Sequence, residues 1–329
     1  MSPFLRLPIL IQLLILKNVS LLDLFHLSLA SKRFKQVVKL MDLTVAKLKW
    51  RLGSDECGIE LRNPKKLCIA SVPSETINFN GSVLTVAHSE SDSHDVLEIR
   101  DQMHQNLELM DQLTAHLSDL FTFSKYNLVL QDFPNLLDCF VWKYTKQFET
   151  VRVTDFSWDP SLSGEEARFL LEVIITDKLW LFSVVDKEFR WNGPLKMREL
   201  SVKKGDWLTL EAMLNMDCEK LLFHFTNTIT YQYLNTIIKK WLTGGLKNLK
   251  EIKVINFNPV HGDSRDTKLV HILEGIENFP WDVNNRPGTL GLCNGRDIRR
   301  SDGTFATLEY FRDFQALVFH VWDSLSVAQ

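Results

Sequence analysis

Histidine and carboxylate side chains come closest together in the run HSESDSHD, where His88, Asp92, His94 and Asp95 fall within eight residues. Imidazole nitrogens and carboxylate oxygens at such short spacing are ligand types that zinc takes in proteins. The run also holds three serines and no apolar residue, a composition typical of a solvated loop tip. A metal site needs ligands that the fold holds in place. We therefore predict no metal site here, and none elsewhere in the chain.

Catalytic and cofactor motifs are missing from the sequence. It contains no GxxxxGK[ST] phosphate loop, no GxGxxG, no GxSxG nucleophile elbow and no HExxH. The glycine-rich segment 288–295 has no strand-to-helix context, so it predicts a turn. Arg299 and Arg300 could grip a phosphorylated partner, but adjacent strand residues point to opposite faces. We expect no catalytic residue and no cofactor, because an enzyme would need a pocket of convergent titratable groups.

The five cysteines are odd in number and scattered, with no two closer than eleven positions. This spacing favours neither a zinc site nor a disulfide framework. We expect buried, reduced thiols in a protein of the cytoplasm, the nucleus or both. The five are Cys57, Cys68, Cys139, Cys218 and Cys293.

The charge is unevenly distributed along the 329 residues. Residues 1–53 hold nine basic and two acidic side chains, whereas the remainder holds 29 basic and 39 acidic ones. Such asymmetry suggests two parts with different partners. The formal net charge of only −3 gives no indication of nucleic-acid binding. No segment reaches the ~20 apolar residues of a membrane-spanning helix, so we expect no membrane partner.

The elements that position any N-terminal site come from FLRLPILIQLLILKNVS and the LLDLFHLSLASKRFKQVV that follows. The first run lacks the small-residue cleavage site of a secretory signal. Pro8 suits the first turn of a helix, Ser20 and Asp23 form an S-x-x-D capping pattern, and Ser31 can cap a further helix. Three short helices are too few to bury this much leucine among themselves. Surplus apolar surface on a small unit indicates a protein–protein interface.

Two alternatives remain for this segment. The helices could simply pack on the rest of the chain, or they could form a basic helix-turn-helix that binds DNA. A DNA-binding unit needs a recognition helix with polar side chains that reach base edges. Residues 21–29 offer mostly apolar side chains instead.

The pattern of Leu7-Pro8 and Ile15-Leu16, followed by DLFHLSLASKRF, resembles an F-box. The resemblance implies a three-helix unit that binds the Skp-family adaptor of SCF ubiquitin ligases, which in turn bridges to a cullin. Leu10 and Gln12 stand where the family more often has an acidic and an aliphatic residue. Carried over from the motif, the adaptor-binding residues would be Leu7, Pro8, Ile11, Ile15, Leu16, Leu24, Leu27 and Phe34.

Short apolar strands recur from residue 126 onward, at intervals of 23, 28, 21, 21 and 31 residues. This spacing and an L-x-L core are typical of leucine-rich repeats. They predict an α/β domain with a curved, mostly parallel sheet and helices outside. An ordinary α/β domain with a parallel sheet is the alternative. The equivalent strand positions are Leu128, Val151, Leu179, Leu200, Leu221 and Ile252.

A second resemblance overlaps these strands. The stretch GPLKMRELSVKKGDWLTLEAMLNMDCEKLLFHF, with TYQYLNTIIKKWLTGGLKNLKEIKV after it, is similar to the type 2 F-box-associated domain. We therefore expect an F-box at 1–45, a connecting region at 46–125 and a leucine-rich-repeat-like F-box-associated domain at 126–329. In the connecting region we expect a strand at 66–70, a hairpin at Asn80-Gly81 and a long helix over 96–120. Asp302-Gly303 predicts a further hairpin.

The two resemblances imply a substrate-recognition subunit of an SCF-type ubiquitin ligase. It would bind a Skp-family adaptor through the F-box and an unknown target protein through the C-terminal domain. The alternative is an interaction scaffold outside any ligase, with a repeat-like binding surface. Exposed aromatic residues are the best candidates for partner contact; Trp207, Trp241 and Trp281 are candidates, each equally explicable as core.

Overall fold

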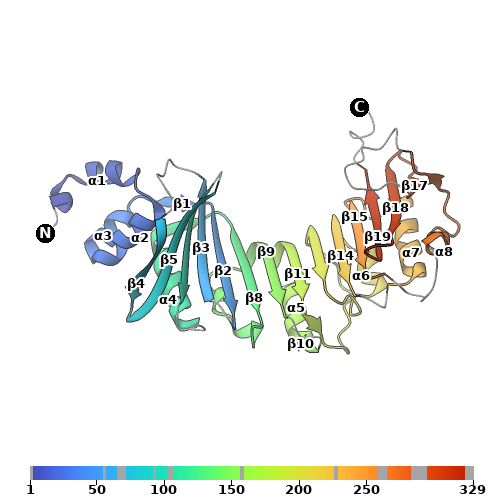
Figure 1. The fold of residues 1–329 in the computed structure, drawn as a ribbon, viewed down its shortest axis with the longest axis horizontal. Coiled ribbons are helices and arrows are strands. Elements are labelled where there is room, and N and C mark those ends of the chain that lie inside the picture. The colour runs from blue at the N-terminus through green and yellow to red at the C-terminus, as the bar shows by residue number, and fades with distance from the viewer. Residues whose placement is uncertain are drawn as a thin grey trace. The chain divides into compact units, whose positions relative to one another are not determined.

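The computed structural model describes residues 3–54, 57–64, 72–91, 94–101, 107–155, 159–225, 229–257, 265–282 and 295–322. The chain divides into two compact units, residues 1–151 and residues 152–329. Figure 1 shows helices at the N-terminal end and strands through most of the remaining chain.

The first unit begins with the three short helices that the sequence predicts. A 3₁₀ turn (Pro3–Arg6) precedes α1 (Ile9–Leu16), α2 (Leu21–Ala30) and α3 (Lys32–Lys39). The hydroxyls of Ser20 and Ser31 accept hydrogen bonds from backbone N–H groups in the first turns of α2 and α3. These caps satisfy N–H groups that have no partner inside a helix.

A largely antiparallel sheet makes up much of the same unit, in the order β8-β2-β3-β6-β5-β4. Only β2 and β8 pair in parallel within this group, while β1 and β7 form a separate parallel pair. The strands are β1 (Leu43–Val45), β2 (Lys47–Gly53), β3 (Cys57–Pro64), β4 (Val72–Phe79), β5 (Ser82–Ser91), β6 (His94–Asp101), β7 (Phe121–Phe123) and β8 (Tyr126–Gln131).

Helix α4 (Leu107–Leu120) packs on this sheet through Trp50, which is fully buried on β2. The indole Nε1 of Trp50 donates to Thr114 Oγ1 of α4 at 3.0 Å. The hairpin expected at Asn80-Gly81 is confirmed, with positive φ angles of 50° and 86° at the two residues.

The long helix predicted over 96–120 is wrong in its first part, because β6 occupies residues 94–101. In the sequence DVLEIRD, apolar Leu97 and Ile99 alternate with charged Glu98 and Arg100. That period of two belongs to a strand. The strand expected at 66–70 lies outside the described residues. Two short 3₁₀ segments, Leu136–Asp138 and Phe140–Lys143, follow β8.

The boundary between the units falls within β9 (Gln147–Thr154). In the second unit four strands run parallel, and each pairs with the next. They are β11 (Ile175–Phe182), β13 (Glu199–Val202), β14 (Lys220–His224) and β15 (Glu251–Ile255). Four of the six strand positions predicted to be equivalent are partners in this sheet: Leu179 pairs with Leu200, Leu200 with Leu221, and Leu221 with Ile252. All four side chains are at most 2% exposed.

The prediction of a mostly parallel, leucine-rich-repeat-like sheet is corrected, because the sheet is mixed. Beyond β15 the order continues with β19, β18, β17 and β16, all in antiparallel pairs. The hairpin expected at Asp302-Gly303 is confirmed between β17 and β18, with φ of 89° at Gly303. Antiparallel neighbours can be joined by a short turn, as β17 and β18 are here.

The remaining bounds in the second unit are as follows. The helices are α5 (Gly164–Glu172), α6 (Leu210–Leu214), α7 (Tyr231–Leu242) and α8 (Arg265–Ile272). The strands are β10 (Pro160–Leu162), β12 (Val184–Val185), β16 (Phe279–Pro280), β17 (Arg296–Arg299), β18 (Phe305–Phe311) and β19 (Ala316–Val321).

Helix α7 covers one side of this sheet through the fully buried Trp241, whose ring meets that of Phe319 edge to face at 5.4 Å. Ser163 and Glu166 form a capping box at the start of α5. Within the described parts of the chain, no helix has the length and apolar character needed to cross a bilayer.

Candidate functional site

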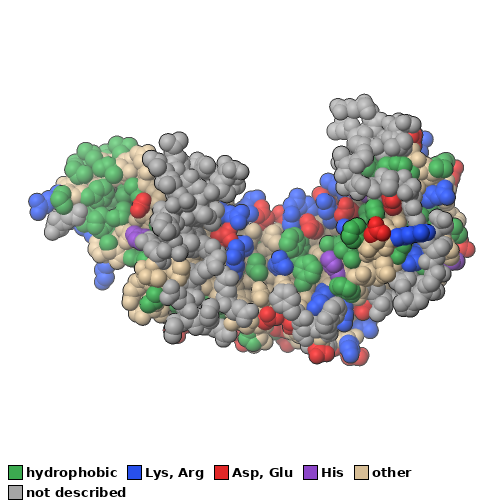
Figure 2. Space-filling view, in the orientation of Figure 1, with side chains coloured by type: hydrophobic (Ala, Val, Ile, Leu, Met, Phe, Trp, Pro, Cys, Tyr) green, Lys and Arg blue, Asp and Glu red, His purple; other side chains and the backbone are tan. Residues whose placement is uncertain are grey.

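Helix α1 and the turn before it carry an uncovered apolar surface, which we call the α1 face. Leu10 is 72% exposed and Leu14 60% exposed. The other members are 38–44% exposed. Figure 2 shows hydrophobic side chains gathered over the helix that Figure 1 labels α1. The α1 face consists of Leu7, Ile9, Leu10, Ile11, Leu14 and Ile15.

The sequence of α1, ILIQLLIL, explains this exposure, since a helix that is apolar on every side cannot bury all its faces against one neighbour. Only Gln12 and Leu16 are buried within the helix. The amide of Gln12 turns inward and donates to the carbonyl oxygen of Leu7 at 2.6 Å. Gln12 therefore braces the start of the helix, while Leu10 adds apolar area to the α1 face.

Helices α2 and α3, in contrast, bury their apolar sides within the first unit. Leu24 and Phe25 are 1% and 0% exposed. The hydroxyl of Ser28 donates to the carbonyl of Phe25 and lies 2.8 Å from His116 Nε2 on α4. Intramolecular packing, one of the alternatives open from the sequence, therefore describes α2 and α3 but not the outer side of α1.

His116 marks the contact between α2 and α4. Its ring meets those of Phe25 and Phe79 at centroid distances of 6.0 and 5.7 Å. Burial lowers the pKa of His116 to about 4, and the nearby ammonium of Lys35 acts in the same direction. The imidazole is therefore neutral at pH 7. The Ser28 hydroxyl donates its hydrogen to the carbonyl oxygen of Phe25, so its oxygen is left to accept a hydrogen bond. A neutral imidazole that carries its hydrogen on Nε2 supplies that bond.

The structure divides the eight adaptor-binding residues predicted from the sequence. Four lie exposed, two are half-buried, and two belong to the core. The core pair maintains the packing of the helices and offers no surface to a partner. The exposed residues are Leu7, Pro8, Ile11 and Ile15, the half-buried ones are Leu27 and Phe34, and the core ones are Leu16 and Leu24.

The prediction did not include Ile9, Leu10 and Leu14 among the contact residues, although all three belong to the α1 face. The signal was present in the sequence, because the helix has no polar residue except Gln12. A short helix without a polar side must expose some of its aliphatic residues.

Acidic residues from later in the first unit neutralise much of the N-terminal basic excess. Asp119 accepts both Lys35 and Lys39, and Glu149 pairs with Lys47 and Lys125. Glu60 is 3% exposed and binds three cations, those of Lys49, Arg51 and Arg62. These ion pairs engage much of the basic cluster on which the DNA-binding alternative rests.

The candidates for metal and thiol chemistry give no assembled site. The side chains of HSESDSHD lie outside the described ones, and the described residues hold no group of three or more potential metal ligands. Cys57, Cys139 and Cys218 are buried free thiols, as expected, while Cys68 and Cys293 lie outside the described residues. Burial raises the pKa of the Cys139 and Cys218 thiols to about 12, so both stay protonated.

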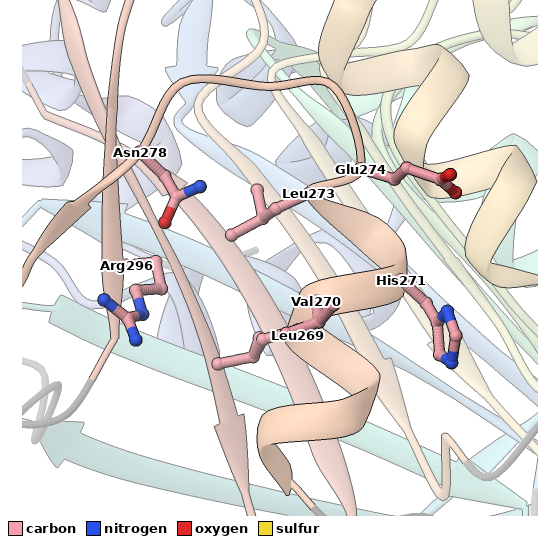
Figure 3. A pocket seen from close by; sticks show the side chains of 7 residues that line it. All are labelled: Leu269, Val270, His271, Leu273, Glu274, Asn278 and Arg296. Atoms are coloured by element: carbon pink, nitrogen blue, oxygen red, sulfur yellow. The ribbon is translucent and has the colours of Figure 1, made fainter.

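A cavity of about 550 Å³ adjoins α8 in the second unit. Figure 3 shows Arg296 and Asn278 on one side of it, whereas His271 and Glu274 point away on the other side of the helix. Its polar groups do not converge as a catalytic site requires. The arginine pair is separated too: Arg299 lies over the ring of Phe305, while Arg300 lies over that of Trp241 and pairs with Asp302.

Two of the three tryptophans considered for partner contact, Trp207 and Trp241, are core residues at 3% and 0% exposure. Trp281 is half-buried and lies 5.8 Å from the ring of Trp322. The ring of His224 packs beside that of Phe182, with 5.4 Å between the ring centres. Burial lowers its pKa, and the charge of Lys253 lowers it further.

Comparison with known proteins gives two family matches and one relative. The chain is 23% identical to the Caenorhabditis elegans "Uncharacterized protein F59B2.8" over 347 aligned positions, covering 97% of this chain and 77% of the relative. No solved structure matches significantly. Residues 4–45 match the F-box domain family, and residues 188–254 match the F-box associated family. F-box domains generally bind Skp-family adaptors, and both domains are typical of adaptor and receptor proteins. By these two matches the chain is an F-box protein that carries an F-box associated domain.

Proposed function

We propose that this chain is the substrate-recognition subunit of an SCF-type ubiquitin ligase. Its three N-terminal helices bind a Skp-family adaptor, which connects them to a cullin. The observation that carries the proposal is the α1 face: α2 and α3 bury their apolar sides internally, while six aliphatic side chains on and before α1 stay uncovered. When a partner covers apolar surface of this kind, the removal of that area from water favours binding.

The chain contributes position rather than chemistry to ubiquitin transfer. The second unit holds a target protein, and the adaptor and cullin bring that target near the ubiquitin-charged enzyme. Tethering of this kind raises the effective concentration of the reacting groups without a catalytic side chain in the receptor. The expected place of action is the cytoplasm, the nucleus or both.

Co-expression of the full chain with a Skp-family adaptor, followed by size-exclusion chromatography, tests the adaptor contact. The test variants are Leu10→Asp and Leu14→Asp, because both side chains are exposed and their replacement leaves the core intact. The control is Val270→Asp on α8, an equally drastic change at an aliphatic residue that is 67% exposed. A carboxylate buried against an apolar partner weakens binding by on the order of a hundredfold.

Co-elution of the wild type and the α8 variant, but not of the α1 variants, would support the proposal. If all variants co-elute, the α1 face is not the contact. If the folded wild type and adaptor elute separately, the chain is an interaction scaffold whose N-terminal helices bind something else.

A further inference from the structure

In the second unit, one side of the sheet is covered by no described helix. A cross-strand row runs over β11, β13, β14, β15 and β19 in register, through Trp180, Ser201, Leu222, Lys253 and Val318. Side chains alternate between the faces of a strand, so this row points away from the buried leucine row beside it. We call this side of the five strands the open face. Most of its side chains are half-buried or exposed, in contrast to the buried opposite side.

Aromatic rings and an arginine form one end of the open face. The guanidinium of Arg152 lies 5.9 Å from the ring centre of Trp180 and 5.5 Å from that of Phe182. The indole N–H of Trp180 donates to Glu199 at 3.0 Å, which fixes the ring. Rigid Trp and Arg side chains that stay partly exposed are the residues that contribute most to protein–protein binding. Figure 2 shows hydrophobic, basic and histidine side chains together over the strands that Figure 1 labels β11 and β14.

A cavity of about 310 Å³ lies at the other end of the open face. Its apolar lining comes from β15, from β19 and from the turn before β19, where Phe314 is 71% exposed. Lys253 and Glu251 supply its polar part. This volume is at the lower limit for small-molecule pockets. It suits one aromatic or large aliphatic side chain of a protein partner.

The acidic residues of the open face already have partners. Glu199 lies 3.6 Å from the ammonium of Lys178 and also accepts the Trp180 N–H. Glu251 lies 3.5 Å from His320, whose hydrogen bond holds the pKa of Glu251 below its ordinary value.

Several basic residues of the open face, in contrast, lack a carboxylate within ion-pair distance in the described chain. Lys220 and Lys253 lie near Glu251 and help to lower its pKa, but neither reaches it. The Nε of Arg152 donates to the hydroxyl of Thr154 at 3.1 Å, not to an acid. The charge left without a counterion is therefore positive, and it selects partners that carry negative charge.

We propose that the open face binds an acidic protein segment that places one aromatic or large aliphatic side chain in the cavity over β15 and β19. Carboxylates beside that anchor pair with Lys253 and Lys220, and a more distant one reaches Arg152. The inference rests on the proposed function only where it assigns this segment to the target of the ligase. The binding of an acidic segment is inferred from the charges and the cavity of the open face alone.

The test measures fluorescence anisotropy of labelled short peptides with the full-length chain. One peptide has a central Phe flanked by Glu and Asp, a second has Lys in place of every acid, and a third has Gly in place of Phe. The variants are Lys253→Glu and Phe314→Asp. Lys239→Glu on α7 is the matched control, because it makes the same charge change at an exposed residue away from the open face.

We expect only the acidic Phe peptide to bind tightly, and each open-face variant to weaken it by about tenfold or more. The control should bind as the wild type does. Equal weakening by the control, or equal binding of the Gly peptide, would overturn the proposal by showing general charge attraction. Displacement by an oligonucleotide without aromatic dependence would do the same and indicate a polyanion site.

The same variants are then tested for adaptor co-elution. Retained adaptor binding with lost peptide binding separates the open face from the α1 face. Absence of adaptor binding in the wild type, with peptide binding intact, would refute the ligase function and leave the open face as a binding site.

Discussion

Mild acid should loosen the contact between the F-box helices and α4, because His116 is neutral in the folded protein. Its pKa falls from an ordinary 6.5 to about 4, chiefly because the ring is buried. In the unfolded chain His116 takes up a proton as the pH falls through 6.5, whereas the folded chain does so only near pH 4. Protonation of His116 therefore favours the unfolded chain below about pH 7. The free energy of unfolding is highest above that pH and falls as the pH falls.

The loss can be estimated from the shift. One pKa unit corresponds to about 1.4 kcal/mol, so the first unit should lose about 2 kcal/mol between pH 7 and pH 5. Carboxylates do not interfere in this window. The pKa of Asp119 is lowered by its hydrogen bonds from Lys39 and Lys35, so its contribution is lost only in more acidic solution.

Hydrogen exchange of the α2 amides, followed by mass spectrometry at pH 7 and pH 5 and corrected for the intrinsic rate, measures this loss locally. His116→Gln is the informative variant, because the amide can still donate to Ser28 but does not titrate. We expect the acid-induced loss of protection in the wild type and its absence in the variant. An equal loss in both would refute the assignment to His116.

Four further substitutions test the packing. Leu24→Ala should lower the free energy of unfolding by about 2–5 kcal/mol because Leu24 is in the core. Ile15→Ala should change the free energy of unfolding by only about 0.5 kcal/mol, because Ile15 is exposed. Similar urea midpoints for the Leu24 and Ile15 variants would contradict the assignment of Leu24 to the core and Ile15 to the surface. Glu60→Gln should lower the free energy of unfolding by about 1–3 kcal/mol, since three partly exposed basic neighbours lose their shared carboxylate. Gly81→Ala should cost about 1–2 kcal/mol because φ at this turn is +86°; an unchanged melting temperature would show that the turn relaxes.

The parallel part of the second unit was predictable to the residue. One face of each strand must be buried, and a slip by one residue would turn every leucine outward. Leu179, Leu200, Leu221 and Ile252 could therefore be aligned by eye, and they are partners in the sheet. The direction of the last strands was not predictable in this way, because the alternation of FQALVFHV is the same whether the strand runs parallel or antiparallel.

The accessible part of the candidate site was harder to predict. A leucine at α1 and one at α2 look alike in sequence, and which becomes core depends on a distant segment. Here that segment is α4: its His116 contacts Ser28 of α2, and its Asp119 forms ion pairs with lysines of α3. The open face was not predictable for a related reason. Trp180 lies in a strand whose leucines set the apolar pattern, and its ring is paired with Arg152, which comes from another strand.

The two surfaces differ in their physics, and this difference makes them separable. The α1 face is aliphatic, so covering it is driven by removal of apolar area from water, which excluded salts such as sulfate strengthen. The open face relies on Arg152, Lys220 and Lys253, whose attraction to an acidic partner is screened within ~8–10 Å at moderate ionic strength. Rising sodium chloride should therefore weaken binding of the acidic peptide while the adaptor stays bound, as chromatography in stepped salt would show. Simultaneous release of both would mean that the helices also depend on charge, through exposed basic residues such as Lys32 at the start of α3.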